Sequence, residues 1–182
     1  MCLRANMLHM KQVRALLLLL GVAALCVAQD GKAKSTEGRP DFSGNWVLDH
    51  GKSSLGPLER NLANAEVTLV IAHKEPEFKM TRKANSGGRE LSQILNYYSD
   101  GRGETNPAIL GSADIKSKTK WEKTRLVSNG SSSIRLPNGE TASLDFSEKR
   151  ELSADGNTLT ITDSISSPRG LQVIKQVYAR AP

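Results

Sequence analysis

The chain has 182 residues, of which 38% are hydrophobic, and a formal net charge of +6. Three of its 25 lysines and arginines lie in the first 28 positions, so the remainder carries 22 basic against 19 acidic residues, a net charge of +3. The cations gather only modestly, in KMTRK and KSKTKWEK. Nucleic-acid binding favours denser cations with interleaved aromatic residues, and we therefore expect no nucleic-acid partner.

Residues 1–28 have the pattern of a secretory signal peptide. Basic residues and no acidic ones accompany the apolar run ALLLLLGVAALCVA. This run is shorter than the roughly 20 residues that a membrane-spanning helix needs. We predict cleavage after Ala28 and a secreted or periplasmic protein. The alternative is lipid attachment at Cys26, which the bulky Leu25 before it disfavours.

We expect the chain after the predicted signal peptide to contain one domain. Cys2 and Cys26 both precede the cleavage site, so the exported protein would hold neither a disulfide nor a thiolate metal site. Residues 29–40, QDGKAKSTEGRP, are polar and predict a disordered N-terminal leader. Residues 41–182 are long enough for one domain with its own core, and we expect a monomer with no transmembrane segment in the mature chain.

From residue 41 onward the hydrophobic pattern has a period of two, which is typical of strands with one wet face. In DIKSKTKWE (114–122), Lys116, Lys118 and Lys120 fall on one face, and apolar or small residues on the other. Turn residues bound each such run. Eight further runs are FSGNWVLD (42–49), EVTLVIAH (66–73), EFKMTRKA (77–84), RELSQILNYY (89–98), TRLVSN (124–129), TASLDFSEKREL (141–152), NTLTITDSIS (157–166) and LQVIKQVYAR (171–180).

Nine or so sequential strands predict an all-β fold. Such a meander must leave exposed edges or close on itself, so we predict a single antiparallel up-and-down β-barrel of about eight to ten strands. The segments SDGRG, NGSSS (129–133), SADG and SPRG are predicted turns. The one long connection, residues 51–65, contains Pro57 as the start of a short helix and is a candidate lid.

The tripeptide Gly44–Trp46, at the head of the first strand, resembles the Gly-x-Trp signature of lipocalins and fatty-acid-binding proteins, the calycin group. PDFSGNWVLDHGKSSLG and LSADGNTLTITDSIS are similar to small exported bacterial lipocalin-like proteins without an assigned function. This resemblance implies that Gly44 permits a close approach and that Trp46 plugs one end of the barrel beneath Arg180. The chain departs from the Arg-x-Tyr carboxylate clamp of fatty-acid-binding proteins, since Tyr178-Ala179-Arg180 stands in the last strand.

Several polar residues fall in the inward register among apolar ones, so they are candidates for binding a ligand's polar end. The candidate ligand-binding residues are Arg82, Glu148, Arg150, Asp163, Phe78 and Trp121. The alternative is that bulges or rim positions leave the polar ones solvated or mutually paired. A barrel of this size either fills with side chains or holds one small ligand.

These patterns favour a noncatalytic binding protein for a small apolar or amphipathic ligand. The alternative is a structural or protein-interaction module, an envelope accessory or inhibitor, with a filled barrel. Such a module would bind its partner through the face of Lys116, Lys118 and Lys120 or through the open rim of the barrel. Only His50 and His73 follow the predicted leader, and no Gly-x-Ser-x-Gly motif is present. We therefore expect no enzyme activity, no cofactor and no bound metal.

Overall fold

The computed structural model describes residues 38–107, 113–135, 139–167 and 170–182. The predicted signal peptide, residues 1–28, and most of the predicted leader, residues 29–40, lie outside the described residues. Within them the regular elements are β1 (Gly44–Leu48), two 3₁₀ turns (His50–Lys52 and Gly56–Leu58), α1 (Glu59–Leu62), β2 (Glu66–Lys74), β3 (Glu77–Ser86), β4 (Arg89–Tyr98), β5 (Glu104–Asn106), β6 (Ile115–Glu122), β7 (Arg125–Arg135), β8 (Thr141–Leu152), β9 (Thr158–Ser167) and β10 (Gly170–Arg180).

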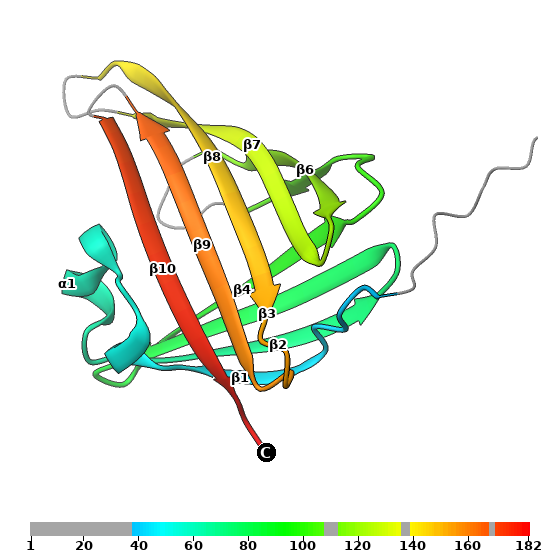
Figure 1. The fold of residues 1–182 in the computed structure, drawn as a ribbon. Coiled ribbons are helices and arrows are strands. Elements are labelled where there is room, and N and C mark those ends of the chain that lie inside the picture. Colours follow the sequence, from blue (N-terminus) through cyan, green and yellow to red (C-terminus); the bar gives the residue numbers. More distant parts are fainter. Residues whose placement is uncertain (1–37, 108–112, 136–138, 168–169) are drawn as a thin grey trace, which may run out of the picture. The chain divides into compact units, whose positions relative to one another are not determined.

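The ten strands form one antiparallel sheet in the order β4-β3-β2-β1-β10-β9-β8-β7-β6-β5. The first and last strands are neighbours, with Trp46 opposite Arg180 and Leu48 opposite Tyr178. The sheet curls, so that β8, β9 and β10 cross in front of β1 to β4 in Figure 1. The prediction of a single antiparallel up-and-down β-barrel with a short helix after the first strand is confirmed.

Side chains join the two ends of the sheet, β4 and β5. Asn106 of β5 accepts a hydrogen bond from the backbone N–H of Asn96 at 2.7 Å, and its Nδ2 donates to the Asn96 carbonyl at 2.9 Å. Glu104 Oε2 accepts from the N–H of Tyr98 at 3.3 Å. An amide side chain thus satisfies the donor and acceptor that a neighbouring strand would otherwise pair. The barrel is nearly closed, with a side-chain seam in place of one backbone ladder.

The up-and-down topology gives the barrel two ends. The β2–β3, β6–β7 and β8–β9 turns lie with Trp46 at one end, the Trp46 end, and the long β1–β2 connection lies at the other, the helix end. The core fills the Trp46 end, because alternate residues of each strand point inward. Its fully buried apolar side chains include Phe42, Trp46, Leu69, Phe78, Met80, Leu126, Leu159, Ile161 and Tyr178.

The β1–β2 connection packs along β10 at the helix end (Figure 1). Ser54 exchanges two backbone hydrogen bonds of 2.8 Å with Lys175, and the side chain of Leu55 is buried. Leu58 and Leu62 are partly buried against the core, so α1 is held by its apolar side. Among the described residues, none of the helices has the length and hydropathy to cross a membrane.

The structure corrects one predicted turn and adds one strand. Residues 129–133 belong to β7 and are not a turn. Gly130 serves a close approach of two strands, because a Cβ there would lie 2.1 Å from the carbonyl oxygen of Lys116 on β6. The additional strand, β5, has three residues, which is too short for a period of two to be recognised in the sequence.

Candidate functional site

A group of polar side chains lies inside the barrel, between the packed Trp46 end and the helix end. They come from six strands on several sides of the barrel, and each occupies an inward position of its strand. We call this group the interior polar cluster. Its members are Arg82 (β3), Tyr97 (β4), Ser128 (β7), Glu148 and Arg150 (β8), Asp163 (β9), and Gln176 and Tyr178 (β10).

Arg150 is held firmly within this cluster. Its side chain is fully buried, forms an ion pair with Glu148, and donates from Nη1 to Ser128 Oγ at 2.8 Å. The guanidinium carbon lies 3.9 Å from the ring centroid of Tyr97 and 5.2 Å from that of Phe78. Because a guanidinium is attracted to aromatic faces, two rings and one carboxylate together stabilise this buried charge.

Asp163 and Glu148 lie directly opposite each other in the ladder of β8 and β9. Gln176 Nε2 donates to Asp163 at 3.1 Å, and the hydroxyl of Tyr178 donates to Gln176 Oε1 at 2.6 Å. Burial first, and then the negative charge of Glu148, raise the pKa of Asp163 to about 7. The carboxyl group of Asp163 therefore titrates near neutral pH.

Both arginines of the cluster have buried guanidinium nitrogens without a hydrogen-bond partner among the described residues, namely Nε and Nη2 of Arg150 and of Arg82. Arg150 Nη2 forms the ion pair with Glu148, and Arg82 has no such ion pair among the described residues. Burial opposes its charge, but the neighbouring Tyr178, Glu148 and Asp163 outweigh burial and raise the pKa of Arg82. Gln93, directly opposite on β4, also has an unpaired side-chain oxygen. The cluster therefore contains two buried guanidinium groups with N–H donors that lack a partner among the described residues.

On the helix-end side of this cluster, the inward side chains are apolar and incompletely covered. Leu144 and Phe146 of β8 and Ile165 of β9 are only partly buried, although they follow the inward register of their strands. Leu91, which shares the inward register of β4, is 57% exposed. We call these four inward side chains the apolar cup, and along their strands they lie on the helix-end side of Arg82, Glu148 and Asp163.

The structure brings most of the candidate ligand-binding residues together. Arg82, Glu148, Arg150 and Asp163 belong to the interior polar cluster, and Phe78 lies beneath it against Arg150. Trp121 lies elsewhere, at the Trp46 end. Its ring stacks on Phe42 with centroids 5.9 Å apart, and its Nε1 donates to Glu75. Trp121 is inward in register, but it is the second-to-last residue of β6. It therefore lies at the Trp46 end of the barrel and away from the apolar cup.

The sequence interpretation missed four members of the cluster, namely Tyr97, Ser128, Gln176 and Tyr178. The strand period contained the signal for the two on β10, because Ile174, Gln176 and Tyr178 alternate and all three are buried. The contacts of Arg150 with Ser128 and Tyr97 depend on strands that are distant in sequence, which the period of two does not report.

Gly44, Trp46 and Arg180 meet at the Trp46 end. The guanidinium of Arg180 lies 4.2 Å from the Trp46 ring centroid and donates to the Ser43 carbonyl at 2.8 Å. Trp46 is fully buried, and its Nε1 donates to the Phe42 carbonyl at 3.1 Å. A Cβ at position 44 would lie 2.4 Å from Arg180 Nη1, and the φ of +139° is one that L side chains rarely adopt. Glycine is thus required for the arginine to lie over the indole.

Glu75 anchors the segment that precedes β1 at this end. Its carboxylate accepts hydrogen bonds from Ser99 and Trp121 at 2.5 Å each and from His73 at 3.3 Å. Burial raises the pKa of Glu75, but these hydrogen bonds together lower it below its usual value. Arg39 pairs with the same carboxylate at 3.5 Å, so Glu75 stays ionised and ties the segment before β1 to the end of β2.

Two cavities open at the surface of the described residues. One, of about 500 Å³, is a polar groove along the β4–β5 seam. The other, of about 140 Å³, lies beside Arg39, Asp41 and Glu75. Neither includes a member of the interior polar cluster.

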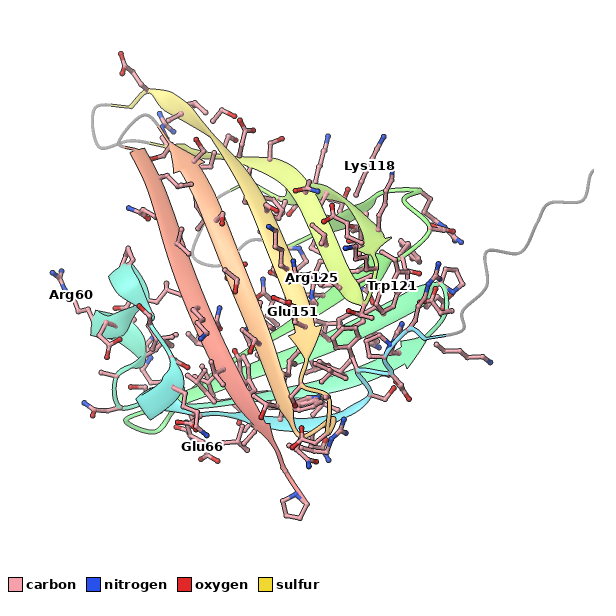
Figure 2. All side chains as sticks on the ribbon, viewed as in Figure 1. Arg60, Glu66, Lys118, Trp121, Arg125 and Glu151 are labelled. Carbon is pink, nitrogen blue, oxygen red and sulfur yellow. The ribbon has the colours of Figure 1, made fainter. Side chains whose placement is uncertain are left out.

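The outer face of β6 carries three exposed lysines, Lys116, Lys118 and Lys120. Figure 2 shows Lys118 projecting away from the barrel. On the next two strands, Arg125 of β7 and Glu151 of β8 form an ion pair of 2.6 Å. This is the face to which the alternative protein-interaction prediction assigned a partner, and it stays a prediction.

Comparisons with known proteins support the fold. No protein-family model matches the sequence, and no curated protein matches it. Among solved structures, human cRBP IV superposes with a TM-score of 0.53 at 17% identity, covering 78% of this chain and 99% of that one. The fatty acid transporter REP1-NXSQ gives 0.51 at 16% identity, with 78% and 97% covered. Zebrafish ileal bile acid-binding protein, in complex with cholic acid, gives 0.51 at 15% identity, with 77% and 98% covered. The chain therefore has a calycin-like fold.

Proposed function

We propose that this protein is a noncatalytic binding protein that holds one small lipophilic or amphipathic molecule inside its barrel, after export from the cell. The observation that carries the proposal is the graded interior. Apolar, partly exposed inward side chains at the helix end lead to a polar layer with unused donors, and below that layer the core is packed. Ligand sites combine an apolar lining with a few convergent polar groups in this way.

The fold supports the same proposal. Two of the solved structures that resemble this chain are named as a fatty acid transporter and a bile acid-binding protein. At these identities the likeness establishes the barrel, and the ligand class rests on the interior of this chain. Export rests on residues 1–28 and would place the barrel where small lipophilic molecules need a carrier through water.

The first test is native mass spectrometry of the full chain purified without detergent, compared with its denatured mass. A small added mass that disappears on denaturation supports an internal ligand and reports its size. The denatured mass also reports cleavage near Ala28 or lipidation at Cys26. Titration with 1-decanol and decanoate, followed by calorimetry, then measures binding directly. No binding of either probe would refute the proposal.

A matched pair of variants locates the bound probe. Ile165→Asp places a charge on an inward side chain of the cup, and we expect it to abolish binding of both probes. Val173→Asp places the same charge on the outer face of β10, where the side chain is 53% exposed, and binding should persist. Circular dichroism of both variants controls for folding. Equal loss in the two variants would contradict an internal site.

A further inference from the structure

One outer face of the barrel carries a line of cations. Lys116, Lys118 and Lys120 are exposed and alternate along β6, and we call them the lysine row. Alternate residues of a strand lie about 6.6–6.8 Å apart, so the row extends over about 13 Å. None of the three amino groups forms an ion pair among the described residues, whereas Lys83, on the outer face of β3, pairs with Glu90. The row is therefore a regular series of three unpaired positive charges.

Two carboxylates adjoin the lysine row, and other groups already use both of them. Asp100 faces the last lysine of the row in an isolated β-bridge, but Arg102 donates from Nε to its carboxylate at 2.8 Å. Glu104 of β5 is buried and points inward, where its Oε1 accepts from Ser117 Oγ at 2.6 Å and from Thr119 Oγ1 at 2.7 Å. The charge of the row is therefore open to a partner outside the chain.

The surface around the lysine row is polar. β7 places Asn129 and Ser131 directly opposite two of the lysines, and both residues are exposed. On the other side, the groove of about 500 Å³ along the β4–β5 seam reaches the row, because Lys116 lines it together with Asn96 and Thr105. No exposed large apolar side chain of the described residues lies on β5, β6 or β7. A partner therefore meets amines, amides and hydroxyls here.

We propose that the lysine row and the seam groove bind an acidic polysaccharide, with its anionic groups at the lysines and a sugar unit in the groove. A polymer with an anionic group at regular intervals is complementary to a straight series of evenly spaced cations. Sugar hydroxyls both donate and accept hydrogen bonds, as do the amide and hydroxyl side chains of the groove. The site lies on the outer surface, so it goes beyond the proposed function and is separate from the interior site.

Three other kinds of polyanion fit this surface less well. An acidic peptide that adds a strand needs a free sheet edge, but β6 has β5 on one side and β7 on the other. Protein interfaces and lipid surfaces are anchored by aromatic or large apolar side chains, which the polar surroundings of the row do not supply. Nucleic acids stack bases on free aromatic rings, but Trp121 of β6 lies inward and Tyr98 of the groove contacts the guanidinium of Arg102. A hydrophilic polymer is thus favoured.

The test is calorimetric titration of the full chain with oligogalacturonate, which carries a carboxylate on every sugar unit, and with uncharged maltooligosaccharide. We expect oligogalacturonate to bind about tenfold or more tightly than maltooligosaccharide, because only the former pairs with the lysines. Its affinity should fall when the salt concentration is raised from about 50 mM to about 300 mM, since salt screens exposed charges. No binding of oligogalacturonate at the lower salt concentration, or equal binding of the two, would overturn the proposal.

Two triple variants separate the row from the net charge of the protein. The first removes the row and should weaken oligogalacturonate binding by about tenfold or more. It combines Lys116→Gln, Lys118→Gln and Lys120→Gln. The second removes three exposed lysines from the outer faces of β2 and β3, and should change the affinity by no more than about twofold, because these charges lie away from the site and are screened. It combines Lys74→Gln, Lys79→Gln and Lys83→Gln. Equal loss in the two variants would show a general charge effect and would overturn the proposal.

Asn96→Leu tests the groove. The seam uses only the backbone N–H and carbonyl of Asn96, so this variant removes the exposed amide and keeps the seam. We expect it to weaken oligogalacturonate binding by about threefold or more, through the loss of hydrogen bonds to the sugar, and to leave binding of poly-L-glutamate unchanged. If poly-L-glutamate binds more tightly than oligogalacturonate and Asn96→Leu affects neither, the partner is an acidic protein and the polysaccharide is refuted.

Binding of vesicles of phosphatidylglycerol tests the remaining class of partner. If these vesicles bind the wild type more tightly than oligogalacturonate does, and the variant without the row loses this binding, the surface is a lipid site and the proposal is refuted. All variants should bind 1-decanol as the wild type does, which controls for folding. If oligogalacturonate binds and 1-decanol and decanoate do not, the proposed function fails and the outer site stands.

Discussion

The substitution Asp163→Asn should change how the stability of the ligand-free protein depends on pH. Its Oδ2 accepts a hydrogen bond from Gln176 Nε2, and an asparagine oxygen can keep this contact. The variant therefore removes the titrating proton and little else. Burial and the charge of Glu148 raise the pKa of Asp163 from 3.8 in the unfolded chain to about 7 in the fold.

The sign follows from proton binding. Between pH 4 and pH 7 the folded protein keeps a proton on Asp163 that the unfolded chain has lost, so the free energy of unfolding of the wild type falls as the pH rises. Each unit of pKa difference corresponds to about 1.4 kcal/mol. The free energy of unfolding of the wild type, minus that of the variant, should thus decrease by up to about 4 kcal/mol from pH 4 to pH 8.

Urea denaturation of both proteins at each pH unit from 4 to 8, followed by tryptophan fluorescence, measures this difference. Glu148→Gln is a second check, because it removes the neighbouring negative charge and should shift the transition to lower pH. Asp155→Asn is a control that should show no pH dependence over this range. Hydrogen bonds, first from Ser153, lower the pKa of Asp155, so its contribution is fully present above pH 4 and is lost only below it. A difference between wild type and Asp163→Asn that stays constant across the range would refute the reasoning.

Three further predictions concern the barrel itself. Gly130→Ala forces a Cβ against the backbone of β6 and should destabilise the fold by about 2 kcal/mol or more, whereas Gly51→Ala, with an ordinary φ and no contact under 3.4 Å, should be nearly neutral in urea denaturation. Arg180→Met loses the cation–π contact with Trp46 and two hydrogen bonds, and should lower the free energy of unfolding by about 1–3 kcal/mol. Asn106→Asp removes the donor at the seam, and faster amide hydrogen exchange confined to β4 would support its role, while unchanged exchange would contradict it.

The period of two predicted the barrel because it records which face of each strand is wet. In Ile161-Thr162-Asp163-Ser164-Ile165 it also placed a carboxylate on the inward face, and the same reasoning placed Arg82 and Arg150. It failed where strands depart from the regular spacing. The turn residues of Asn129–Ser133 suggested a turn, although Gly130 is needed for close strand packing, and β5 is too short to show a period.

Which inward residues meet could not be derived from the strands taken singly. Glu148 lies opposite Asp163 because of the ladder register between β8 and β9, and Arg82 reaches this pair only because the barrel closes. Trp121 illustrates the same limit. Its face is inward, but its height along β6 places it with Phe42 and Glu75 at the Trp46 end. Register and height are properties of pairs of strands, and a single-strand pattern contains neither.

The interior polar cluster is a poor way to stabilise a barrel. Burying charged groups is costly, and replacing a buried ion pair with well-packed apolar side chains of similar volume is often neutral or stabilising. The Trp46 end shows that this chain packs an apolar interior where it needs one, with Leu69, Met80, Leu126 and Leu159 all fully buried. Stability alone therefore does not account for a layer, further along the barrel, in which buried nitrogens of both Arg82 and Arg150 lack a hydrogen-bond partner among the described residues. The proposed binding function gives this layer a use, because ligand sites set a few polar groups in an apolar interior.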